Sequence, residues 1–68
     1  MYPKVLVIDD DFELCHLVQH CLSAEGIDVV PCHNGVSGIS EIVSNHYVLV
    51  ILDIRIPDLD GFTILEKI

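Results

Sequence analysis

The stretch VILDIRIPDLDG, residues 50–61, joins an apolar run to an acidic loop that begins at Asp53. The same pattern occurs near the start of the chain, where KVLVIDDD, residues 4–11, passes from an apolar run into three aspartates, residues 9–11. Short continuous apolar runs are typical of strands that are buried on both faces of a parallel sheet. A carboxylate at the tip of such a strand needs a physical reason, and two such tips raise the question of whether they form one site.

The first half of the chain reads as strand, helix and strand. Residues 5–8 form the first strand, and Asp10 or Asp11 is a natural N-cap for the helix that follows. Gly26 provides a stop at the end of that helix. Residues 27–32 form a second strand. Five apolar residues at helical spacing mark the helix and its expected buried face: Leu14, Leu17, Val18, Cys21 and Leu22.

The second half of the chain continues the alternation of helices and strands. Four apolar residues mark a second helix, which ends near Asn45: Val36, Ile39, Ile42 and Val43. Residues 47–52 form the third and most hydrophobic strand, and a third helix starts near Phe62. Because proline cannot donate to a strand ladder, Pro31 places the second strand at an edge of the sheet. We therefore predict an α/β fold with a parallel sheet of order 2-1-3, right-handed crossovers and helices on both faces.

The charge of the chain excludes several function classes. The 68 residues include eleven acidic and three basic residues, for a formal net charge of −8. Without a basic patch to neutralise phosphates, neither a nucleic-acid nor an anionic membrane surface is expected. The three cysteines, Cys15, Cys21 and Cys32, are an odd number without regular spacing, and no signal peptide or membrane span is visible. These features predict reduced thiols and a cytoplasmic location.

The two acidic tips are expected to meet. Neighbouring parallel strands end on the same side of a sheet, about 4.8 Å apart, so Asp9 and Asp10 should face Asp53. The crevice at this carboxyl edge is where open α/β sheets bind ligands. Carboxylates this close repel one another unless a proton or a cation lies between them. Mg²⁺ suits one or two carboxylates, a carbonyl and several waters, and would leave room for a phosphoryl oxygen.

The motifs VLVIDDDFEL, NG at residues 34 and 35, and VILDIRIPDLDGFTIL resemble the response-regulator receiver domain of two-component signalling. The resemblance covers the whole chain and implies a flavodoxin-like (CheY-like) fold. It implies that residues 1–68 form the N-terminal portion of such a domain, which reaches the start of the third helix. Receiver domains carry a switch Ser or Thr and a Lys on later strands, and both are absent from this chain.

The resemblance also implies roles for individual residues. Asp53 would be the phosphoacceptor for a phosphoryl group from a sensor histidine kinase or a phosphotransfer protein, so the chain would not itself be an enzyme. Asp10 and Asp53 would bind Mg²⁺ directly, Asp9 would act through water, and the backbone carbonyl of Arg55 would be a further ligand. Two residues would shape the following loop: Pro57 and Gly61.

Other interpretations remain open. Asp11 is interpreted simply as a helix cap, and Asp58 and Asp60 as turn residues. His16 and His20 lie four apart and could form a zinc face with the nearby cysteines, but a solvated surface is the simpler interpretation. The competing function is a non-signalling fragment or interaction module. Under both functions, the outer edge of the third strand would have no neighbouring strand in this chain and would be hydrophobic. We therefore expect copies of the chain to associate through this edge.

Overall fold

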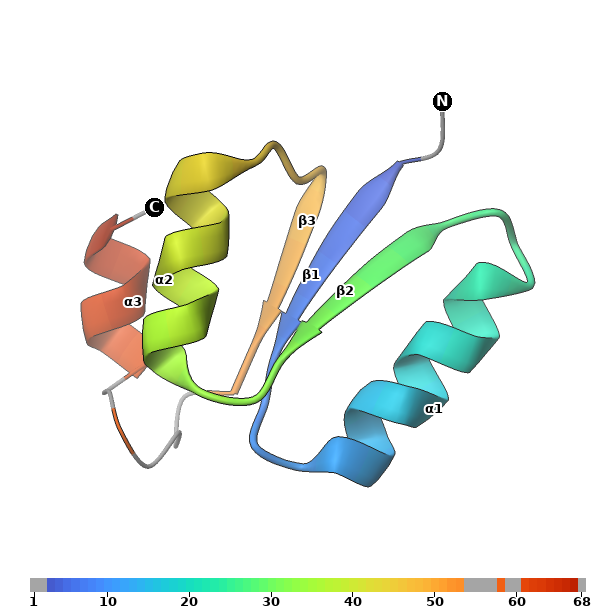
Figure 1. Ribbon diagram of the computed structural model, residues 1–68, viewed down its shortest axis with the longest axis horizontal. Coiled ribbons are helices and arrows are strands. Elements are labelled where there is room, and N and C mark those ends of the chain that lie inside the picture. The colour runs from blue at the N-terminus through green and yellow to red at the C-terminus, as the bar shows by residue number, and fades with distance from the viewer. Residues whose placement is uncertain (1–2, 54–57, 59–60, 68) are drawn as a thin grey trace.

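The computed structural model describes residues 3–53, 58 and 61–67. Strands and helices alternate along the chain, as Figure 1 shows. The elements are β1 (Lys4–Ile8), α1 (Phe12–Ser23), β2 (Asp28–Cys32), α2 (Gly35–Ser44), β3 (Leu49–Leu52) and α3 (Gly61–Lys67). The predicted alternation is therefore confirmed. None of these helices is long and apolar enough to span a bilayer.

The three strands form a parallel sheet of order β2-β1-β3, as predicted. Val7 of β1 lies opposite Pro31 on one side and Ile51 on the other. In the described part of the chain β2 pairs only with β1, so Pro31 lies in an edge strand, where the missing amide donor costs no ladder bond. The strands run in the same direction, so their carboxyl ends lie together at the lower edge of the sheet in Figure 1.

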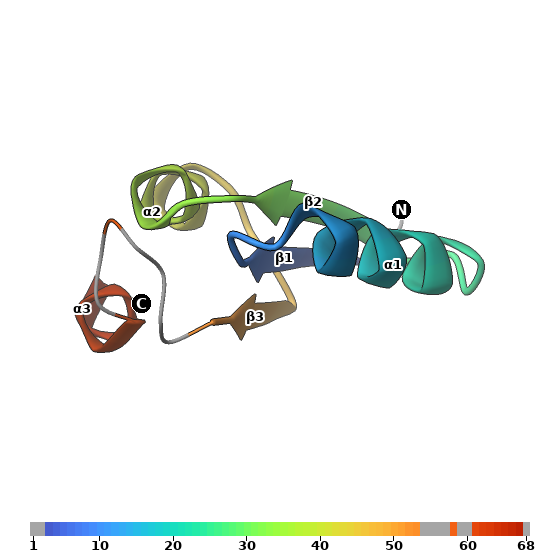
Figure 2. The same cartoon turned by 90° about the horizontal axis from the view of Figure 1, so that it is seen from below.

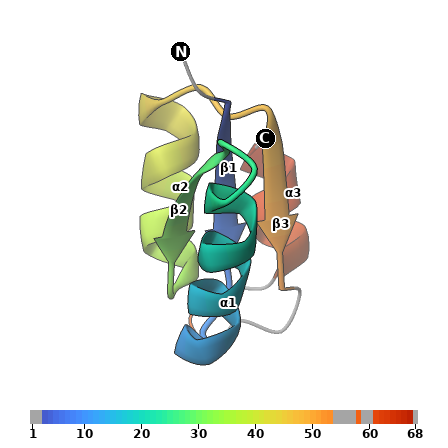
Figure 3. The ribbon, with the colours of Figure 1, turned by 90° about the vertical axis from the view of Figure 1, so that its right-hand side faces the viewer.

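Helices cover both faces of the sheet. α1 lies on one face, and α2 and α3 lie on the other (Figures 2 and 3). Side chains of β1 alternate between two clusters because successive residues of a strand point to opposite faces. On the α1 face, Val5 and Val7 contact Cys15. On the opposite face the cluster consists of Leu6, Ile8, Cys32 and Ile64, with side chains of α2 and β3 around it.

The buried face of α1 differs from the predicted one. Cys15 is fully buried, and Val18 and Leu22 are packed beside it. By contrast, Leu14 and Leu17 are 42% and 58% exposed. The prediction that these two leucines and Cys21 face the core was wrong, because the helix is turned by about one residue and presents Cys15 to the sheet. Cys21 is exposed as well.

The ends of α1 follow the sequence prediction. The Asp11 carboxylate accepts a hydrogen bond from the amide of Leu14 at 3.1 Å, which makes Asp11 the N-cap. Gly26 follows the helix with a φ of 76°, a left-handed conformation that glycine adopts without a steric penalty. Asp11 therefore fixes the point where the first acidic loop turns into a helix.

β2 and β3 start later than predicted. β2 begins at Asp28 rather than at residue 27, and β3 begins at Leu49 rather than at residue 47. The Tyr47 side chain is directed to α2, where its hydroxyl donates to the Glu41 carboxylate. Residue 47 therefore anchors the loop to α2 instead of extending the strand.

Candidate metal centre

Backbone hydrogen bonds fix the two acidic tips at the carboxyl edge of the sheet. The amide of Asp9 donates to the carbonyl of Cys32 at 3.0 Å, one residue beyond the end of β1. The amide of Asp53 donates to the carbonyl of Ile8 at 2.9 Å, one residue beyond the end of β3. Both aspartates are thus held by the same ladder that pairs the strands, which makes their positions a consequence of sheet register.

The three predicted acids form one cluster. Asp9, Asp10 and Asp53 each offer a carboxylate oxygen, and these oxygens lie within 4.8 Å of one another. Asp9 and Asp53 are half-buried, whereas Asp10 is exposed. Magnesium ligands lie about 2.1 Å from the ion, so two ligands on opposite sides are about 4.2 Å apart. Small side-chain movements would therefore suffice for these oxygens to share one Mg²⁺, either directly or through water.

Asp11 is separated from the cluster by its own hydrogen bonds. Its amide donates to the Asp9 carboxylate at 3.0 Å, while its carboxylate caps α1. The bond from Asp11 also holds the Asp9 side chain in place. The interpretation of Asp11 as a helix cap is confirmed.

The remaining predicted site residues follow β3 in the sequence. Arg55, Pro57 and Asp60 fall outside the described residues, and Gly61 is the first residue of α3. Asp58 was expected to be an ordinary turn residue, but its carboxylate accepts hydrogen bonds from the first two amides of α2. No local pattern could have revealed this contact, because the bonded residues are 22 and 23 positions apart.

A buried thiol lies beside the acidic cluster. The Cys15 thiol donates to the carbonyl of Asp9 at 3.5 Å. Burial, and after it the negative charges of Asp9, Asp11 and Asp10, raise the pKa of Cys15 above its ordinary value. Cys15 therefore keeps its proton at neutral pH and is a packing residue rather than a nucleophile or thiolate ligand.

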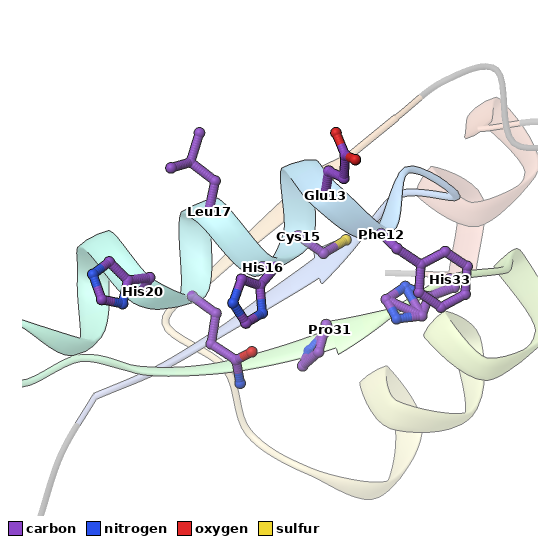
Figure 4. Close-up of a pocket in the computed structure, with 9 residues that line it drawn as sticks. Phe12, Glu13, Cys15, His16, Leu17, His20, Pro31 and His33 are labelled. Atoms are coloured by element: carbon purple, nitrogen blue, oxygen red, sulfur yellow. The ribbon is translucent and has the colours of Figure 1, made fainter.

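A groove of about 820 Å³ lies between α1 and β2, apart from the acidic cluster. His16 and His20 project from α1 along this groove, and the rings of Phe12 and His33 stand at its other end (Figure 4). Both α1 histidines are exposed, as the solvated-surface interpretation expects. Among the described residues the three aspartates are the only group placed to share a metal ion, so the zinc interpretation has no third ligand here.

Comparison with known proteins shows the family of this chain. The family model described as the response regulator receiver domain matches residues 5–68. The chain therefore belongs to the receiver domain family. Its relatives include the regulatory protein VanRc of Enterococcus gallinarum, which is 40% identical over 68 residues. This match covers all of the receiver chain but only 29% of VanRc.

Solved receiver domains have the same fold. A CheY-like receiver domain protein from Methanospirillum hungatei superimposes with a TM-score of 0.94 at 28% identity, covering 98% of this chain and 54% of that one. TrrA of Thermotoga maritima is 31% identical, and its complex with Mg²⁺-BeF has a TM-score of 0.88, with 96% and 56% of the two chains covered. TrrA has also been solved in complex with the histidine kinase ThkA; that structure has a TM-score of 0.87. The CheY-like, flavodoxin-like fold predicted from the sequence is confirmed.

Proposed function

We propose that this receiver chain accepts a phosphoryl group on Asp53 in a two-component phosphorelay, with Mg²⁺ as cofactor. The observation that carries the proposal is the meeting of three carboxylate oxygens within 4.8 Å at the tips of two neighbouring strands. Metal-bound and kinase-bound structures of TrrA support it by analogy. The phosphoryl donor would be the phosphohistidine of a sensor histidine kinase or phosphotransfer protein. The transfer would take place in the cytoplasm.

Each acid has a distinct part in the proposed reaction. Asp10 and Asp53 would hold the cation directly, Asp9 would hold it through water, and the carbonyl of Arg55 would complete the set of protein ligands. When bound, Mg²⁺ supplies positive charge that offsets the repulsion between the carboxylates and the phosphoryl oxygens. Pro57 and Gly61 would shape the loop that follows the acceptor.

The transfer itself needs only one nucleophile from this chain. A carboxylate oxygen of Asp53 attacks the phosphorus atom of the donor phosphohistidine, and an aspartyl phosphate forms. The phosphorus–nitrogen bond breaks, its electron pair returns to the imidazole nitrogen, and that nitrogen takes a proton from water. Asp53 is consumed once per transfer, so we propose an acceptor rather than a turnover enzyme.

The test is the intact mass of the protein after incubation with Mg²⁺ and a small acyl phosphate. We expect the wild-type chain to gain one phosphoryl group and Asp53→Asn to gain none. Glu25→Gln is a matched control, because Glu25 is an exposed acid in the turn at the far end of α1. It should gain phosphate like the wild type. An equal gain by Asp53→Asn, or a gain that a chelator does not prevent, would contradict the proposal.

We also propose that copies of this chain associate through the outer edge of β3. Within residues 3–53, 58 and 61–67, β3 pairs with β1 alone. Leu49 at the start of β3 and Val48 directly before it are 54% and 71% exposed. An apolar edge strand with free backbone groups favours pairing with another strand, and a second copy of the chain supplies one.

A further inference from the structure

The first amides of α2 are satisfied from outside the helix by Asp58. Its carboxylate accepts hydrogen bonds from the amide of Gly35 at 2.7 Å and from the amide of Val36 at 3.1 Å. The next amide, of Ser37, donates to the Asn34 side chain at 2.8 Å. The first turn of a helix has no acceptors of its own for these amides. Asp58 therefore supplies acceptors for the first two amides of α2, and Asn34 supplies an acceptor for the third.

The charge of Asp58 and the burial of Gly35 strengthen this contact. A carboxylate bonded to two backbone amides forms charge-assisted hydrogen bonds, and it faces the positive end of the helix dipole. Gly35 is buried, so its amide has little access to water as a replacement partner. Loss of Asp58 would leave a buried donor unpaired, which is costly in a folded protein.

The amino end of α2 is also linked to the first acidic loop. His33, directly before the cap residue Asn34, packs its ring against that of Phe12, with the ring centroids 3.8 Å apart. Phe12 directly follows the three aspartates after β1. The facing rings stand beside the start of α1 in Figure 4. The amino end of α2 is thus linked both to Phe12, directly after the first acidic loop, and to Asp58.

Asp58 and Asp53 anchor the two ends of one short piece of chain. The amide of Asp53 is bonded to β1, and the carboxylate of Asp58 is bonded to α2. Only residues 54–57 separate the two, and they include Arg55, whose carbonyl is a proposed cation ligand. The chain is therefore anchored by a described contact both before and after this proposed ligand.

We propose that Asp58 is a positioning residue for the metal centre: its bonds to the amides of Gly35 and Val36 fix residue 58 at the amino end of α2, five positions after the phosphoacceptor. The inference rests on the proposed function, because it concerns how the Asp53 site is kept in shape for its cation. Asp58 is not one of the three acids that the described structure places to share a cation. Its loss should therefore weaken cation binding without removing the three carboxylates that bind it.

The experiment is a Mg²⁺ titration followed by the backbone amide signals of Asp9 and Asp10 in the 68-residue chain. We expect Asp58→Ala to weaken Mg²⁺ binding by about tenfold, the lower end of the effect seen when groups that orient metal ligands are removed. Asp58→Asn, which keeps one acceptor oxygen, should lie between Asp58→Ala and the wild type. Glu25→Gln removes the same charge elsewhere and should bind Mg²⁺ like the wild type.

Hydrogen exchange at Gly35 and Val36 supplies a readout that needs neither metal nor phosphate. Exchange of these two amides should become faster in Asp58→Ala and Asp58→Asn, while the amides of β1 stay protected. Unchanged exchange, or Mg²⁺ affinity equal to that of Glu25→Gln, would overturn the inference. If the wild type binds Mg²⁺ but takes no phosphoryl group, the proposed function fails while the positioning role stands. If the wild type binds no Mg²⁺, both fail.

Discussion

The phenol of Tyr47 is tied to the end of α2 and carries a pH-dependent contribution to stability. Its hydroxyl donates to the Glu41 carboxylate, and the Lys4 ammonium lies 5.4 Å from the centre of its ring. Burial, followed by the hydrogen bond to Glu41, raises the pKa of Tyr47 above its ordinary value of 10.0. The folded state therefore favours the protonated phenol, which is the form that can donate to Glu41.

The sign of the pH effect follows from this shift. Below about pH 10 the phenol is protonated in both states, so its contribution to the free energy of unfolding is constant. Above pH 10 the unfolded chain loses the Tyr47 proton while the folded chain retains it, and this contribution declines. We expect Tyr47→Phe to be less stable than the wild type by about 1 kcal/mol near pH 8, where it lacks the hydrogen bond. The difference should shrink at pH 10 to 11.

Urea unfolding of both proteins at pH 8, 10 and 11 measures this difference. The two proteins share Tyr2 and all three cysteines, so the ionisation of those groups cancels in the comparison. A difference that stays constant across this range would show that Tyr47 ionises equally in both states.

At the scale of the element, the approach of α2 to β1 depends on Gly38. A methyl group at this position would lie 2.5 Å from Cδ1 and 2.9 Å from Cγ1 of Ile8. Ile8 is fully buried and has little room to move. In an exposed helix interior alanine is about 1 kcal/mol more favourable than glycine, but overpacking a core costs about 1 to 3 kcal/mol. The overlap should therefore outweigh the gain in helix propensity.

We expect Gly38→Ala to lower the free energy of unfolding by about 1 kcal/mol. Ile8→Val removes Cδ1, the atom nearest to the new methyl group, and alone should also cost about 1 kcal/mol. The double variant should lose less than the sum, because the two changes relieve one another. A double-mutant cycle measured by urea unfolding tests whether the two substitutions are coupled. Strictly additive losses of stability would show that α2 shifts away from β1 instead.

At the scale of the whole molecule, the sheet and the acidic cluster could be predicted because their signals are local. Continuous apolar runs indicate buried parallel strands, and Pro31 identifies the edge strand. Once the order 2-1-3 is fixed, register alone brings Asp9, Asp10 and Asp53 together. No long-range contact has to be guessed for this part of the site.

The features that could not be predicted depend on packing or on distant contacts. On α1, residues 14, 17 and 21 and residues 15, 18 and 22 have the same helical spacing, so periodicity cannot choose between the two faces. In the structure the face with residues 15, 18 and 22 packs against the sheet, so the small Cys15 lies against Val5 and Val7. The bond between Asp58 and α2 joins two loops that only the folded sheet brings together, and the sequence has no signal for it.

The outer edge of β3 should determine how the 68-residue chain behaves in solution. Besides Val48 and Leu49, Ile51 is 39% exposed, so apolar side chains are uncovered here. Among the described residues β3 has a strand partner on one edge alone, which is β1. We expect sedimentation velocity to show dimers or larger species at tens of micromolar protein. Ile51→Lys should shift the distribution towards monomer, because pairing would bury the new charge.

Val43→Lys is the matched control for this experiment. Val43 is 71% exposed on α2 and lies outside the sheet, so a lysine there changes net charge and surface hydrophobicity without touching the edge. Its association should equal that of the wild type if β3 is the contact. A folded wild-type monomer at tens of micromolar would contradict self-association, and equal effects of the two lysines would indicate charge repulsion between whole molecules instead of strand pairing.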